Sequence, residues 1–137
     1  MDIAVTKDDS GILLEVMVAM AAADGTIDER EASTISGIYK DIVGRDVSES
    51  QVKKAAEERK RQGTDLIERL RAAASELDRS AKERIVRAAY LVLLADDAIA
   101  GSERKKLKDI ATALKIPEVH FGAILEDVAV WLQQRGQ

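Results

Sequence analysis

This chain of 137 residues contains no cysteine, a single proline and only 3% aromatic residues. The lack of cysteine excludes disulfides, thiolate chemistry and zinc sites built on cysteine ligands. The shortage of proline and aromatic residues, set against abundant Ala, Leu, Glu, Lys and Arg, favours helix over strand. The composition therefore predicts an all-α protein.

Long apolar runs are also missing. The longest one, residues 88–95, is far below the roughly 20 residues that a helix needs to cross a bilayer. The first nine residues are acidic and lack the basic-then-apolar order of a signal peptide. These two features predict a soluble cytoplasmic protein without membrane insertion.

Two further classes of function have little support in the sequence. Residues 51–87 are locally basic, with eleven Lys and Arg against seven Asp and Glu, but they lack aromatic residues for base stacking, so a solvated helix face is expected there rather than a nucleic-acid site. No glycine-rich phosphate loop occurs, and His120 is the only histidine, which leaves serine nucleophiles without a base. We expect no nucleic-acid partner, no organic cofactor and no catalytic residue, with His120 at the surface or at a helix start.

The chain instead contains an internal repeat with an offset of 72 residues. Asp24 and Glu31 lie seven residues apart, and so do Asp96 and Glu103. Apolar positions follow the same offset, which pairs Leu13 with Ile85, Met20 with Val92, Ile27 with Ile99, Ile35 with Leu107 and Ile38 with Ile110. Self-similarity of this kind indicates that one supersecondary unit occurs twice. We predict repeat one at about 10–62, a bridging helix at about 64–78 and repeat two at about 80–135.

Hydrophobic content of 46% and a length of 137 residues fit one domain, 1–137, in which both repeats share a single core. Apolar spacing and capping patterns predict about seven helices arranged as a pseudo-twofold bundle. The first helix, at about 10–23, and the fifth are the most apolar and should pack side by side at the centre. Capping boxes are expected at Asp28, Ser48 and Ser80. The fourth helix is expected at about 65–77, and the seventh should turn Ala129 and Leu132 inward, with Trp131 and Tyr90 in the core.

The acidic residues around the two interhelical loops are the candidate site. Asp24 and Asp96 follow apolar helices at their carboxyl ends, where the helix dipole makes a carboxylate unfavourable by roughly 0.3–1 kcal/mol. Helix-end carbonyls and nearby carboxylates form an all-oxygen set that suits a hard cation such as calcium, magnesium or manganese. The candidate ligands are Asp24, Asp28, Glu31, Asp96, Asp97 and Glu103.

A purely structural interpretation of these acids stays open. Asp24 and Asp96 can accept hydrogen bonds from backbone amides of the following turn, while Asp28 and Glu31 form a capping box. In the second repeat, Ala100 stands where the first has Asp28, so Glu103 has no capping partner at the equivalent position. The loop is not an EF-hand, because its twelfth position counted from Asp24 is Ile35 rather than Glu.

Three segments resemble the tellurite-resistance TerB-like family: residues 21–31 (AAADGTIDERE), residues 94–103 (LADDAIAGSE) and residues 107–117 (LKDIATALKIP). The resemblance covers roughly residues 10–130. It implies an all-helical duplicated fold, acidic residues proposed to bind metal, no known catalysis, and a link to tellurite resistance and wider stress responses. Asp24, Glu31, Asp96 and Glu103 match the acidic motif positions. Asp97 in place of Gly25 and Ala100 in place of Asp28 imply that the two loops differ in affinity.

We therefore expect a non-enzymatic stress-response protein that binds a divalent cation weakly and presents a surface to a protein partner. The alternative is an interaction scaffold whose acids only cap helices and whose partner surface is the acidic amino-terminal half. A hydrolase that uses carboxylates with metal is a third possibility, but the sequence offers it no nucleophile and no proton shuttle.

Overall fold

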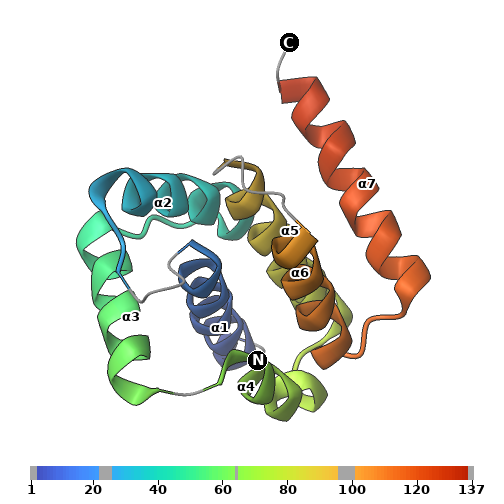
Figure 1. Ribbon diagram of the computed structural model, residues 1–137, viewed down its shortest axis with the longest axis horizontal. Coiled ribbons are helices and arrows are strands. Elements are labelled where there is room, and N and C mark those ends of the chain that lie inside the picture. The colour runs from blue at the N-terminus through green and yellow to red at the C-terminus, as the bar shows by residue number, and fades with distance from the viewer. Residues whose placement is uncertain (1–2, 22–25, 64, 96–100, 136–137) are drawn as a thin grey trace.

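The structure is a computed structural model that describes residues 3–21, 26–63, 65–95 and 101–135, with side chains described from residue 10 and, after the third gap, from residue 104. The described residues form seven α-helices, a 3₁₀ turn and no strand, which confirms the all-α class (Figure 1). The helices are α1 (Ile3–Ala21), α2 (Glu29–Val43), α3 (Glu49–Gln62), α4 (Leu66–Ala73), α5 (Arg79–Ala95), α6 (Gly101–Ala113) and α7 (Glu118–Arg135), with the 3₁₀ turn η1 (Ala74–Glu76) after α4.

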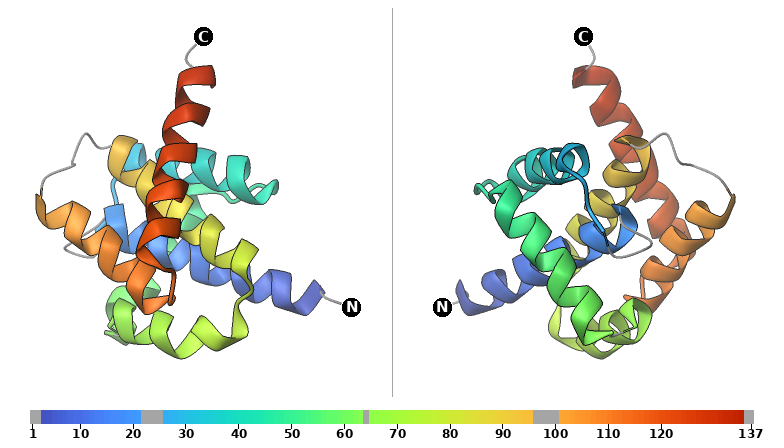
Figure 2. Two further views of the ribbon diagram at one scale, coloured as in Figure 1. Left: turned by 90° about the vertical axis from the view of Figure 1, so that its right-hand side faces the viewer. Right: turned by 60° about the vertical axis from the view of Figure 1, so that its left-hand side comes forward.

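The two most apolar helices lie at the centre of the fold, as the sequence predicted. Helix α1 makes its most extensive contacts with α5, and Leu13, Met17 and Ile85 are essentially inaccessible to solvent. In Figure 2 the two helices run side by side through the middle of the molecule. Each buries several faces, because sequences this apolar are stable in water only at a core position.

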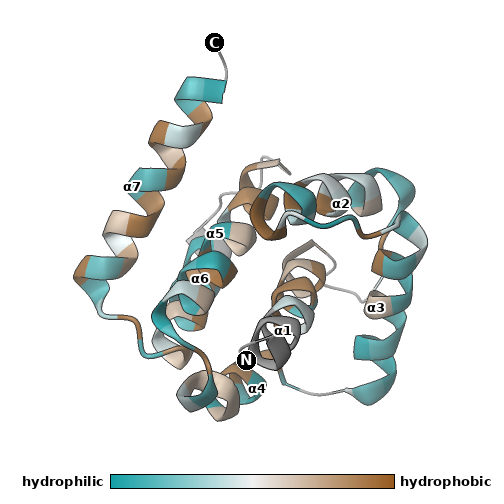
Figure 3. Ribbon diagram, turned by 180° about the vertical axis from the view of Figure 1, so that it is seen from behind, coloured by the Kyte–Doolittle hydropathy of each residue, from teal (hydrophilic) through white to brown (hydrophobic). Residues whose placement is uncertain are grey.

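The remaining helices surround this central pair. Helix α2 contacts both α1 and α5, α3 covers α1, and α6 and α7 pack on α5, while α4 lies against α6. Helix α7 stands at the edge of the molecule, and its carboxyl end extends beyond the other helices (Figure 1). Seen from behind, the residues of α3 are hydrophilic along most of its length (Figure 3). No helix in the described ranges is long and apolar enough to cross a membrane.

Local capping chemistry sets both ends of α2 and α3 and the start of α5. Asp28 and Ser48 both form the predicted capping boxes, and Gly44 and Gly63 end α2 and α3 with φ of 85° and 65°. These are left-handed conformations that glycine adopts without a Cβ penalty. The capping prediction at Ser80 is wrong. Asp78 lies directly before α5, and its Oδ1 accepts a hydrogen bond from the Ala81 amide at 2.8 Å, so Ser80 falls inside the helix.

Four other sequence predictions need correction. Helix α1 begins at Ile3 rather than near residue 10, and α4 ends at Ala73 before the 3₁₀ turn. Ala129 and Leu132 do not face inward; Leu132 is 37% exposed because the last turns of α7 extend past the helices that cover its first half. Trp131 and Tyr90 are half-buried at the edge of the core rather than inside it.

The 72-residue offset agrees with the structure at one helix boundary, since α2 begins at Glu29 and α6 begins at Gly101. The third helices do not follow it as closely, because α3 begins at Glu49 and α7 at Glu118. Internal duplication and the repeat boundaries 10–62, 64–78 and 80–135 therefore remain predictions.

Candidate functional site

The structure describes part of the predicted metal site. Asp28 and Glu31 are described in full, at the start of α2. Asp24, Asp96 and Asp97 lie outside the described residues, and Glu103 belongs to α6 with its side chain outside the description. Within the part of the chain whose side chains are described, no three carboxylate or imidazole groups gather closely enough to hold a metal ion.

Asp28 and Glu31 are engaged with each other's backbone. The Glu31 amide donates to Asp28 Oδ1 at 2.8 Å, and the Asp28 amide donates to Glu31 Oε1 at 3.0 Å. Asp28 has the extended backbone, φ −84° and ψ 176°, that a residue before a helix adopts. These two acids therefore have a structural role, which is what the alternative interpretation predicted for them.

Asp28 and Glu31 still have oxygens for a cation while they form the capping box. The capping box uses one oxygen of each carboxylate, and a carboxylate has two oxygens with about four acceptor sites in total. Asp28 is exposed and Glu31 is half-buried, so their second oxygens do not sit in a dry interior. Oxygen donors of this kind suit calcium, magnesium or manganese better than zinc or copper.

The capping role of Asp28 gives a direct stability prediction. Replacing it with alanine removes the acceptor for the Glu31 amide and should lower the free energy of unfolding by about 0.5–2 kcal/mol. Asp28→Asn is the matched control, because asparagine caps as well as aspartate and should cost only a small fraction of that. Urea denaturation of the three proteins measures the difference. An equal loss in both variants would show that charge, not capping, is what Asp28 contributes.

One contact connects the helices that flank the two acidic segments. Lys106, in the second turn of α6, places its Nζ 3.5 Å from the carbonyl oxygen of Ala19. Ala19 lies in the last turn of α1, where carbonyls have no partner within the helix. A cation is favourable at this negative end of the helix dipole. The start of α6 and the end of α1 are therefore neighbours.

Sequence reasoning did not identify Lys106. Its sequence signal is weak, since it is one of several lysines in a polar helix, and its partner is a backbone carbonyl 87 residues away. It matters for the site because it brings α6 to the end of α1, while its ammonium repels a cation bound beside it.

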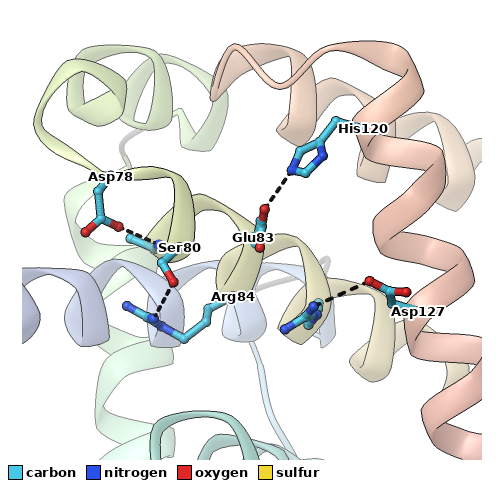
Figure 4. A network of polar contacts seen from close by, with 8 residues as sticks. Asp78, Ser80, Glu83, Arg84, His120 and Asp127 are labelled. Carbon is cyan, nitrogen blue, oxygen red and sulfur yellow. Dashed lines mark hydrogen bonds and ion pairs between the residues drawn. The ribbon is translucent and has the colours of Figure 1, made fainter.

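His120 is the other titratable group that the sequence singled out. It lies in the first turn of α7, as expected for a residue at a helix start, and its Nε2 is 2.7 Å from Glu83 Oε2 on α5. Figure 4 shows this pair bridging the two helices. Both side chains are half-buried, so the contact fixes the amino end of α7 against the core.

Comparisons with known proteins identify a family. A family model described as "Tellurite resistance protein TerB" matches residues 12–126, which is most of the chain. Comparisons with curated proteins and with solved structures gave no match.

Proposed function

Since the chain belongs to the TerB family of tellurite resistance proteins, we propose that it is a non-enzymatic module that binds a hard divalent cation weakly at its acidic interhelical segments. In this proposal Asp24 and Asp96 ligate the ion directly, and Glu31 and Glu103 complete its oxygen shell, with Asp28 and Asp97 close by. The bound ion favours one arrangement of the surrounding helix ends, which is presented to a protein partner in a stress-response complex.

The contact between Lys106 and Ala19 carries this proposal. It supports a shared site because it brings the beginning of α6, which follows the second acidic segment, to the end of α1, which precedes the first. The direct contacts of α1 with α2 and α5, and of α5 with α6, add to this support. Two or three carboxylates from one segment bind a cation only weakly, whereas ligands from both segments hold it better.

An interaction scaffold without metal is the second candidate, and the capping box of Asp28 and Glu31 favours it. In that case the acids only stabilise helix starts, and the partner surface is the acidic amino-terminal half of the chain. The two candidates differ in one measurable property, the response of folding stability to divalent cations.

Thermal unfolding with and without calcium, magnesium or manganese tests the proposal. A ligand at about ten times its dissociation constant stabilises the folded state by about 1.4 kcal/mol, provided that it does not bind the unfolded chain. For a chain of this length, that raises the midpoint by roughly 3–6 °C. We expect a shift of this size for at least one of the three ions at millimolar concentration.

The matched control is the double variant Asp24→Asn plus Asp96→Asn, which leaves the capping box of Asp28 and Glu31 intact. Its midpoint should respond to the same ion by less than half of the wild-type shift. If no ion shifts the wild-type midpoint, or if the double variant responds fully, the proposed cation site is wrong.

A further inference from the structure

A cleft of about 420 Å³ lies between α2, α5 and α7, and neither Asp28 nor Glu31 lines it. This volume falls in the range of pockets that bind small organic molecules. The apolar residues that line the cleft are Ile42 of α2, Leu91 of α5, and Val128 and Trp131 of α7, of which Leu91 and Val128 are buried. Charged side chains from all three helices line the rest.

Two of the carboxylates in the cleft have close cationic or imidazole partners. Asp41 is 2.7 Å from the guanidinium of Arg135, and Glu83 is 2.7 Å from His120. The third pair is different: Arg87 lies 3.8 Å from Asp127, at the long limit of an ion pair, and their side chains are 40% and 70% exposed. Solvent screens exposed pairs of this kind, so Asp127 holds Arg87 only weakly.

Arg87 is placed to bind an anion beside an apolar surface. Leu91 follows Arg87 by one turn on α5, and Trp131 follows Asp127 by one turn on α7, so the guanidinium and the apolar wall are adjacent. Figure 4 shows Asp127 reaching from α7 toward α5. The Asp127 carboxylate occupies the position in which a ligand carboxylate would pair with Arg87. The planar Arg87 guanidinium has several N–H donors for such a carboxylate.

Arg135 contacts Trp131 at the edge of the cleft. The guanidinium of Arg135 lies 4.6 Å from the centre of the Trp131 ring while it pairs with Asp41 across the cleft. A guanidinium over an aromatic face is attractive, and this one ties α7 to α2. The indole is therefore held in a defined position at the wall of the cleft.

We propose that this cleft is a binding site for a small organic acid: its carboxylate replaces Asp127 on Arg87, and its aromatic or branched aliphatic body packs on Leu91, Val128 and Trp131. Binding of the acid does not depend on a metal ion. The volume of the cleft suits a free small acid.

The fluorescence of Trp131, the only tryptophan in the chain, reports on this site. The test titrates metal-free protein with 3-phenylpropionate, and in parallel with 3-phenylpropan-1-ol and 3-phenylpropylamine, which have the same body with a neutral or a positive group. We expect a saturable change in Trp131 emission when the acid is added at millimolar concentration or below. The alcohol and the amine should bind at least about tenfold more weakly, because a hydrogen bond to a charged group contributes roughly 1.5–3 kcal/mol.

Two variants separate anion binding from a structural effect. Arg87→Gln should weaken binding of the acid by about tenfold or more. Asp127→Asn breaks the same ion pair from the other side and should bind the acid as tightly as the wild type or several-fold more tightly, since the competing carboxylate is gone. Circular dichroism confirms that both variants keep their helices.

The proposal is wrong if the acid causes no saturable change in Trp131 emission, or if the three compounds bind alike. It is also wrong if both variants weaken binding of the acid to the same extent. The cation titration described above has no part in this assay, so either proposal can fail alone.

Discussion

Replacing Ile85 with alanine should lower the free energy of unfolding by about 2–5 kcal/mol. Ile85 lies on α5 in the central core and has no exposed surface. The change removes buried methyl and methylene groups and leaves a cavity that the packed helices α1 and α5 fill only in part. Urea or guanidinium denaturation of the purified variant measures the loss.

Val119→Ala is the control for Ile85→Ala. Val119 lies in the first turn of α7 and is 87% exposed, so removing its two methyl groups creates no cavity. Its unfolding free energy should stay within about 0.5 kcal/mol of the wild type. Similar losses in the two variants would contradict the central position of α5.

The second large effect is expected at Glu15, which connects three helices through one carboxylate. Its Oε1 is 2.6 Å from Nε of Arg69 on α4, and its Oε2 is 3.4 Å from Arg59 on α3. The side chains of Glu15 and Arg59 are only 17% and 21% exposed. Glu15→Gln removes the negative charge and leaves the mostly buried Arg59 without its countercharge. We expect a loss of about 1.5–3 kcal/mol in unfolding free energy.

Asp46→Asn makes the same chemical change at an exposed ion pair. Asp46 pairs with Lys40 at 3.1 Å, with side chains that are 83% and 64% exposed. Solvent screening makes such pairs worth at most about 1 kcal/mol, so this variant should stay close to the wild type. If Glu15→Gln costs no more than Asp46→Asn, the contact of Glu15 with α3 and α4 does not stabilise the fold.

The parts of the fold that follow from local chemistry were predictable from the sequence. The capping boxes at Asp28 and Ser48 and the left-handed glycines at positions 44 and 63 depend on residues a few positions apart. The central place of α1 and α5 follows from their composition, because an apolar helix has to be buried. The family resemblance agrees with the family model that matches residues 12–126.

Where two local patterns competed, the sequence could not decide between them. Asp78 and Ser80 are two residues apart, and each offers a side-chain oxygen for capping. The pattern of Ser followed by Glu favoured Ser80, but the fold uses Asp78. Likewise, α1 continues seven residues before the first expected residue, since the polar segment before Ser10 shows no apolar periodicity to mark a helix.

Features made by distant residues had no signal in the sequence at all. The cleft combines Asp41, Arg87 and Asp127 from three helices, and the Glu15 network joins positions 44 and 54 residues apart. Trp131 was expected in the core rather than at a binding site, yet it lines the cleft and contacts Arg135. Tertiary arrangement alone sets these contacts.

For the metal site, the sequence indicated the acids, and the structure supplies geometry for Asp28 and Glu31, which cap a helix. The remaining four candidates, Asp24, Asp96, Asp97 and Glu103, keep the status of predicted ligands. The proximity of α1 and α6 at Lys106 explains why we expect the two segments to act together.

A crystal structure of the protein grown with calcium tests the proposed cation site most directly. We predict electron density for an ion near the end of α1 and the start of α6, with oxygens of Asp24, Glu31, Asp96 or Glu103 at about 2.3–2.6 Å. The opposite result would be a well-ordered map in which backbone amides occupy all of these carboxylate oxygens and no ion is present. That map would leave the acids with a capping role alone.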